Sequence, residues 1–167
     1  MAIDIISTFD DQLNSQYEII IQNIPGSSFD TNKVSWRHQG SFEIPEQTPN
    51  TYQVFYKGRS RTKIGGKDES SKEFTLEFRI DQDWELEKAF RAWQTLTYDT
   101  TQIKKGLEKQ IVTKIFVRFL DGDDNVKYTK VFHDVKLKSY KISNFDYSSG
   151  EPSTLTANLI YGKITEE

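Results

Sequence analysis

The chain has 167 residues, of which 35% are hydrophobic, 28% charged and 13% aromatic. This length and balance predict one globular domain over residues 1–167 and exclude a disordered chain. The sequence has no cysteine, which excludes disulfides, thiolate metal sites and cysteine nucleophiles. The net charge of −3 disfavours tight binding to nucleic acid phosphates, which needs an excess of Lys and Arg.

The start of the chain does not resemble a signal peptide. Residues 1–11 carry three acidic and no basic side chains. No apolar run in the sequence approaches the length of a membrane span. We therefore expect a protein without a membrane anchor that is kept in the cytoplasm.

An N-terminal arm is predicted over residues 1–15, because apolar Ile3, Ile5 and Phe9 precede a polar stretch. Such an arm either covers its own core or docks on a neighbour, and the sequence leaves both open. The first clear strand, 17–24, ends at a Pro-Gly turn. Further strands are predicted over 29–36 and over 51–56, which is rich in aromatic and β-branched residues.

A polar stretch over residues 57–72 has too little apolar content to be buried, so it predicts a projecting loop or hairpin. Within it, Lys57, Arg59, Arg61 and Lys63 alternate and would share one face of an extended chain. This basic row is open to two interpretations: a nucleic acid contact, or a solvated face that meets acids on a neighbouring subunit. The second is favoured, because no aromatic residues interleave in the stretch to stack on bases.

Residues 73–80 give the cleanest strand signal, with Phe74, Leu76, Phe78 and Ile80 alternating with polar side chains. One face of this strand is expected to be buried. The other face is expected to meet water or a partner.

The period then changes to that of a helix over about residues 83–97, with Asp81 and Asp83 as expected N-caps. Leu86, Phe90 and Trp93 lie on one apolar stripe, and Glu87 is among the residues expected on the polar side. The stripe is expected to cover the protein's own sheet.

The remaining chain reads as strands joined by turns. They are predicted over residues 111–120, 126–133, 135–142 and 154–161. A single helix excludes repeated βαβ units. The fold class is therefore predicted as mainly β, an antiparallel barrel or sandwich with one flanking helix.

Few residues indicate a catalytic, metal-binding or cofactor-binding site. His38 and His133 stand alone, without metal ligands at a suitable spacing. The acidic turn at 121–125 matches only the start of a calcium loop, and 65–67 lacks the other residues of a phosphate-binding loop. We expect no catalytic residues, no metal and no cofactor, and therefore no enzyme.

Four stretches together resemble the tail tube proteins of contractile-tailed, T-even-like bacteriophages. They are YEIIIQNIPG, the segment RTKIGGKDESSKEFTLEFRID, the helix ELEKAFRAWQTL with its Phe-x-x-Trp-Gln, and the closing VKLKSYKISNFDYSSGEPSTLTANLIYG. The resemblance implies a structural virion protein whose six-subunit rings stack into a tube inside a contractile sheath. It also implies assembly in the host cytoplasm, contacts with sheath, baseplate and terminator proteins, and non-specific passage of genomic DNA through the lumen.

Residues for these contacts can be named as expectations. Contacts between rings are expected at the arm and the projecting stretch, namely Ile3, Ile5, Phe9, Lys57, Arg59, Arg61, Lys63, Asp68 and Glu69. A lumen or inter-subunit face is expected at Thr75, Glu77 and Arg79. Alternatives are a baseplate protein that initiates the tube, or the tube of a secretion system or bacteriocin. A further alternative is a carbohydrate- or protein-binding β-sandwich with Trp36, Tyr52 and Tyr56 as a sugar platform.

Overall fold

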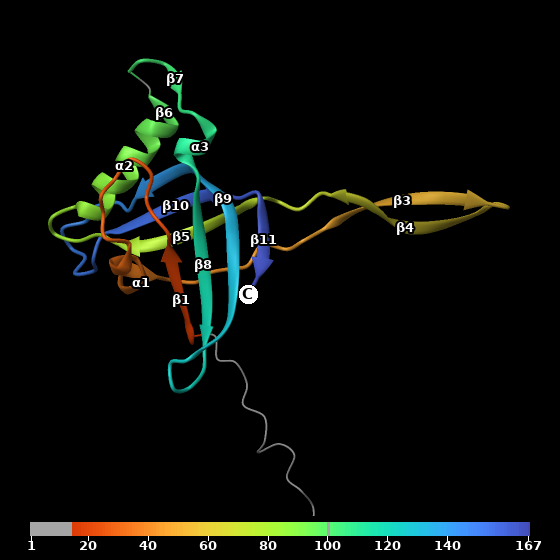
Figure 1. The fold of residues 1–167 in the computed structure, drawn as a ribbon, viewed down its shortest axis with the longest axis horizontal. Coiled ribbons are helices and arrows are strands. Elements are labelled where there is room, and N and C mark those ends of the chain that lie inside the picture. Colours follow the sequence, from red (N-terminus) through yellow and green to blue (C-terminus); the bar gives the residue numbers. More distant parts are fainter. Residues whose placement is uncertain (1–14, 100) are drawn as a thin grey trace, which may run out of the picture.

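A computed structural model describes residues 15–99 and 101–167, without the side chains of Ser35, Trp36 and Lys104 (Figure 1). The predicted arm, with Ile3, Ile5 and Phe9, lies outside the described residues apart from Ser15.

The body is one curled antiparallel sheet of seven strands in the order β1-β8-β9-β10-β5-β2, with β11 paired to β9 (Figure 1). The strands are β1 (Tyr17–Ile21), β2 (His38–Gln39), β5 (Glu73–Arg79), β8 (Thr113–Leu120), β9 (Val126–Ile142), β10 (Thr154–Ile160) and β11 (Lys163–Glu166). The predicted class, a mainly β antiparallel barrel or sandwich with one main flanking helix, is confirmed as a half-barrel.

Strand β9 turns the sheet into a half-barrel. Its first part pairs with β8 and β11, and its last part pairs with β10. Between them, Asp134 adopts a left-handed conformation with φ 55°, where β9 uses one more residue than β8. Such a bulge bends a strand and increases its twist. One continuous bent strand therefore replaces the two predicted over 126–133 and 135–142.

Helix α2 (Glu85–Thr97) packs its apolar stripe on this sheet. Leu86, Phe90 and Trp93 are fully buried, and the Phe90 ring lies 5.7 Å from that of Phe78 on β5. The expectation that Asp81 or Asp83 caps the helix is wrong. Trp84 holds the N-cap position with φ 57° and makes no side-chain capping bond.

The predicted strand over 29–36 is also wrong. The segment forms a short 3₁₀ turn, η2 (Thr31–Lys33), followed by one helical turn, α1 (Val34–Arg37). The Asp30 carboxylate accepts a hydrogen bond from the backbone N–H of Asn32 at 3.1 Å, which starts the turn. Asp and Asn side chains compete in this way with strand pairing.

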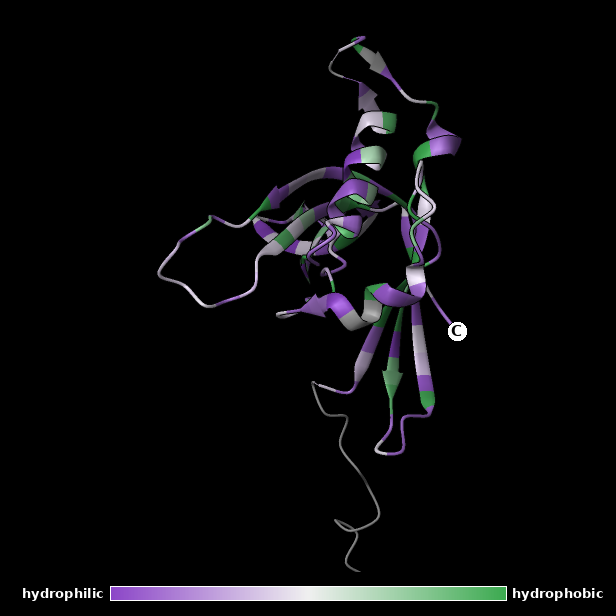
Figure 2. Cartoon of the chain, turned by 90° about the vertical axis from the view of Figure 1, so that its left-hand side faces the viewer, coloured by the Kyte–Doolittle hydropathy of each residue, from purple (hydrophilic) through white to green (hydrophobic). Residues whose placement is uncertain are grey.

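Two further pairs of strands stand apart from the body. A hairpin of β3 (Pro49–Tyr56) and β4 (Arg59–Asp68) extends away from it, as Figure 1 shows. A short pair, β6 (Tyr98–Asp99) and β7 (Lys104–Lys105), precedes α3 (Glu108–Ile111). Along the body strands, hydrophobic and hydrophilic residues alternate (Figure 2), because one face of the sheet forms the core.

Candidate assembly surfaces

The hairpin β3–β4 is the most exposed element of the described chain. Its tip is a two-residue turn in which Lys57 (φ 48°) and Gly58 (φ 72°) are both left-handed. A turn of this kind matches the twist of the flanking strands. Near the base, a side chain at Gly65 would displace the side-chain amide of Asn50, which accepts a hydrogen bond from the backbone N–H of Lys67 at 2.9 Å.

Large apolar side chains of the hairpin face solvent. Phe55 is 74% exposed, Tyr56 71% and Ile64 73%. A two-stranded hairpin is marginally stable by itself, and exposed apolar groups on such an element indicate a surface for a partner.

The predicted basic row lies on one face of β4. Arg59, Arg61 and Lys63 are all exposed, and they pair across the hairpin with Tyr56, Val54 and Tyr52. Partners in an antiparallel pair point to the same side, so this face combines cations with two tyrosines. No aromatic residue interleaves with the basic row in the sequence, but two tyrosines lie beside it in the fold.

Asp68 and Glu69, also expected in ring contacts, lie at the base of the hairpin. The Asp68 carboxylate accepts hydrogen bonds from Lys72 and Ser70, and these bonds hold the pKa of Asp68 well below its usual range. The backbone N–H of Glu69 donates to the carbonyl of Thr48 at 2.8 Å. Both residues thus close the base of the hairpin, and their part in contacts between rings stays a prediction.

Thr75, Glu77 and Arg79 lie on the face of β5 opposite its buried residues. The Thr75 hydroxyl donates to the Asn158 side chain at 3.1 Å, and Gln39 donates to Glu77 at 3.0 Å. These side chains form a polar outer surface on the half of the sheet built from β9, β10 and β5. Their role as a lumen face stays a prediction.

The two strands at the ends of the sheet order, β1 and β2, are open edges within the described chain, and β11 is a third strand with a single partner, β9. Strand β1 pairs only with β8, and β2 pairs only with Phe78 and Glu77 of β5. Open edges present unpaired backbone groups that another strand can join.

The two edges meet through one side-chain contact. The Tyr17 hydroxyl and Nε2 of His38 are 3.0 Å apart. Burial lowers the pKa of His38, and it raises the pKa of Tyr17. The contact joins the two edges at one end of the half-barrel.

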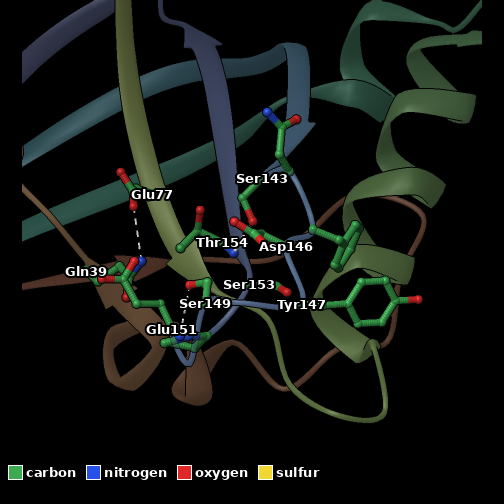
Figure 3. A pocket seen from close by; sticks show the side chains of 12 residues that line it. Gln39, Glu77, Ser143, Asp146, Tyr147, Ser149, Glu151, Ser153 and Thr154 are labelled. Carbon is green, nitrogen blue, oxygen red and sulfur yellow. Dashed lines mark hydrogen bonds between the residues drawn. The ribbon is translucent and has the colours of Figure 1, made fainter.

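A pocket of about 940 Å³ opens at the far end of β5, under the loop between β9 and β10 (Figure 3). Its charged lining residues are Glu77, Asp146 and Glu151, and no basic residue is among the described lining. Ser148 donates its backbone N–H and its hydroxyl to Asp146, which lowers the pKa of that carboxyl group. The sequence had indicated this loop only as a turn.

The histidines and acidic residues of the described part of the chain form no metal site. There, no group of three or more His, Asp or Glu side chains is placed to hold a metal ion. His133 contacts the Thr165 hydroxyl at 2.7 Å. No described helix is long and apolar enough to cross a membrane. Of the predicted sugar platform, Tyr52 and Tyr56 share a hairpin face, and the Trp36 side chain lies outside the described residues.

The whole fold was compared with known proteins, and the similar structures belong to tubes and their terminators. No family model and no curated protein matches the sequence. The structure is similar to a chain of the sheath/tube terminator of an extracellular contractile injection system, PVC, with a TM-score of 0.66 and 12% identity over 95% of this chain and 98% of the other. A chain of the PVC sheath–tube complex gives a TM-score of 0.63 and 11% identity over 100% and 98%.

A phage structure extends the comparison. The SPP1 tail tube matches with a TM-score of 0.51 and 11% identity over 94% of this chain and 79% of the other. The chain therefore has the fold found in the tubes of contractile injection systems and of phage tails. The resemblance to tail tube proteins that four stretches of sequence indicated is confirmed at the level of the fold.

Proposed function

We propose that this chain is a structural tube subunit of a contractile phage tail. In this proposal, six copies close into a ring and the rings stack into the inner tube. The observation that carries it is a tail-tube fold, matched along nearly the whole chain, with a projecting hairpin that pairs with no other strand of the described residues.

Ring closure would use the open sheet edges. Strand β1 of one copy and the β5–β2 edge of the next offer unpaired backbone groups, and joining them removes edges that would otherwise aggregate. A closed ring needs heterologous contacts, in which two different surfaces of the subunit meet. The hairpin then extends beyond the ring and supplies contacts between rings.

The proposed tube surrounds a channel for genomic DNA. The chain carries a net charge of −3, so a wall made of it would not hold phosphates tightly. The sheath, the baseplate and the tail terminator are the proposed partners, and the assembled virion tail is the proposed location after assembly in the host cytoplasm. The role is structural, with no enzymatic step.

Two related functions share this support. The chain could initiate the tube at the baseplate, or form the tube of a secretion system or bacteriocin. Copolymerisation separates them: a tube protein extends tubes of known identity, whereas an initiator is incorporated only at one end.

The direct test is imaging of concentrated protein. We expect electron microscopy to show six-fold rings and stacked tubes, with sedimentation velocity showing a matching large species. A crowding agent should be included, because tube subunits that await nucleation stay monomeric when dilute. A chain that remains monomeric at its highest soluble concentration with crowding, and that does not join preformed tubes, contradicts the proposal.

A further inference from the structure

The hairpin and the acidic pocket lie at opposite ends of the same strand. The hairpin leads into the first residue of β5, Glu73, whereas the loop over the pocket ends where Thr154 pairs with the last residue, Arg79. In Figure 1 the hairpin extends to the right along the long axis, and the loop between β9 and β10 lies at the left end of the body. A projection at one end and a recess at the other suit head-to-tail stacking.

The charges of the two features are opposite. Residues 49–68 carry five basic side chains and one acidic, a net charge of +4, which leaves −7 for the rest of a chain whose total is −3. The pocket is one of the places where this acidity gathers, at Glu77, Asp146 and Glu151. Complementary charge of this kind orients partners and fixes their register.

The apolar groups of the two features also match. The hairpin exposes Phe55 and Tyr56, and the pocket loop exposes Phe145 and, fully, Tyr147. The Phe145 ring lies 6.1 Å from that of Trp84, which places an aromatic side at the pocket (Figure 3 shows the loop). Aromatic and arginine side chains together are the usual anchors of protein interfaces.

The pocket is large enough for a hairpin tip. Its volume of about 940 Å³ is at the top of the range of roughly 300–1,000 Å³ for sites that enclose a drug-sized molecule. It thus exceeds the needs of one side chain. Tyr56 and Arg59 flank the two-residue turn and would enter together.

We propose that this pocket is the receptor for the β3–β4 hairpin tip of a second copy of the chain, in the next ring. The inference rests on the proposed tube function and names the surface that the hairpin meets. The contact is heterologous, so each copy gives a hairpin to one neighbour and receives one from another, and the stack continues without limit. The chain outside residues 49–68 is acidic, which favours a second copy of the chain over a nucleic acid as the partner of the basic hairpin face.

Charge reversal tests the pairing in assembled protein. Arg59→Glu with Arg61→Glu, or Asp146→Lys with Glu151→Lys, should leave rings intact and reduce sedimentable tubes at least ten-fold. The chain with all four changes, whose net charge is that of the wild type, should stack again. Matched controls are Lys67→Glu with Lys114→Glu, and Asp123→Lys with Glu167→Lys, which change charge equally away from the tip and the pocket.

Cysteine crosslinking gives a second readout, because the chain has no cysteine of its own. Ser60→Cys near the tip combined with Ser149→Cys in the pocket should give a ladder of disulfide-linked chains in oxidised tubes. Reduction should remove this ladder. Ser60→Cys combined with Asp123→Cys should give none.

The outcomes separate this inference from the tube function. Wild-type protein that forms neither rings nor tubes contradicts the tube function itself. If the wild type forms tubes, three results overturn the pocket as receptor. They are normal stacking of the pocket variant, no rescue by the four-residue variant, and no ladder from the Ser60 and Ser149 pair. A hairpin variant that stacks normally but no longer binds a single-stranded oligonucleotide assigns the basic face to nucleic acid instead.

Discussion

The half-barrel body and the β3–β4 hairpin use the same residue types in opposite ways. In the body, aromatic rings pack on each other, with Phe74 and Phe132 4.8 Å apart and Phe132 and Tyr161 5.3 Å apart. In the hairpin, Phe55 and Tyr56 face solvent. Alternation of polar and apolar residues therefore does not by itself show which apolar face serves the core and which serves a partner.

We expect the stability of the chain to reside in the body and not in the hairpin. The body buries its aromatic rings, so truncating one leaves a cavity and costs free energy of unfolding. The hairpin buries little within its own subunit, so truncation there should change assembly more than folding. The variants below are ordered by their expected effect on the free energy of unfolding.

Phe90→Ala should have the largest effect, lowering the free energy of unfolding by about 3–5 kcal/mol. Phe90 is fully buried between the rings of Phe78, Trp93 and Tyr140. Urea unfolding followed by circular dichroism measures the change. Phe90→Leu, which refills part of the cavity, is the control and should lose less. Equal stability of Phe90→Ala and the wild type would break the comparison between body and hairpin.

Glu87→Ala should cost about 1–3 kcal/mol, because the partly buried hydroxyl of Tyr140 then loses its acceptor. Glu87 is only 2% exposed, and it accepts hydrogen bonds from Arg91 at 2.8 Å and from the Tyr140 hydroxyl at 3.1 Å. The Arg91 side chain is largely exposed and can be hydrated, which limits the loss. Calorimetry should show a lower melting temperature.

Glu85→Ala is the matched control for that variant. Its carboxylate is half-exposed and lies 3.6 Å from Lys33. Exposed ion pairs contribute about 0–1 kcal/mol. If both substitutions cost the same, the buried position of Glu87 has no energetic consequence.

Glu87 also marks the limit of prediction from sequence. Helical periodicity placed Leu86, Phe90 and Trp93 correctly in the core, because the spacing of apolar residues carries that signal. It placed Glu87 on the polar side, yet the curvature of β9 brings the Tyr140 hydroxyl within hydrogen-bonding distance. A one-dimensional pattern contains no information on a partner that is 53 residues away.

The same limit explains the other differences. Strand 73–80 was predictable because its alternation reports one buried face. The segment 29–36 was mistaken for a strand, since the Asp30 cap that turns it into η2 competes locally with strand pairing. Tyr52 and Tyr56 join the basic row only through the register of β3 with β4, and the acidic pocket unites residues from three distant parts of the chain. Tertiary structure creates both surfaces.

Acidification should have a smaller effect on the body through His38. Burial lowers the pKa of this side chain in the folded protein below its ordinary value of 6.5. As the pH falls below about 6.5 the unfolded chain binds the proton first, so stability present at higher pH is lost. The urea midpoint of the wild type should therefore fall more between pH 7.5 and 5.5 than that of His38→Gln. Parallel changes in the two proteins would contradict a role for His38 at the junction of the sheet edges.

Phe55→Ala should have the smallest effect on folding and complete the comparison with Phe90. Phe55 is 74% exposed on the hairpin, and substitutions at such positions usually change the free energy of unfolding by less than about 0.5 kcal/mol. The substitution should still reduce the stacking of subunit rings, because the exposed phenyl group of Phe55 is free to contact a partner. Urea unfolding of the monomer and sedimentation of tubes, measured on the same preparation, separate the two effects. Thr62→Ala, a polar truncation on the same face of the hairpin, is the control and should leave both unchanged. A large loss of monomer stability in Phe55→Ala would mean that the hairpin packs on its own subunit in solution.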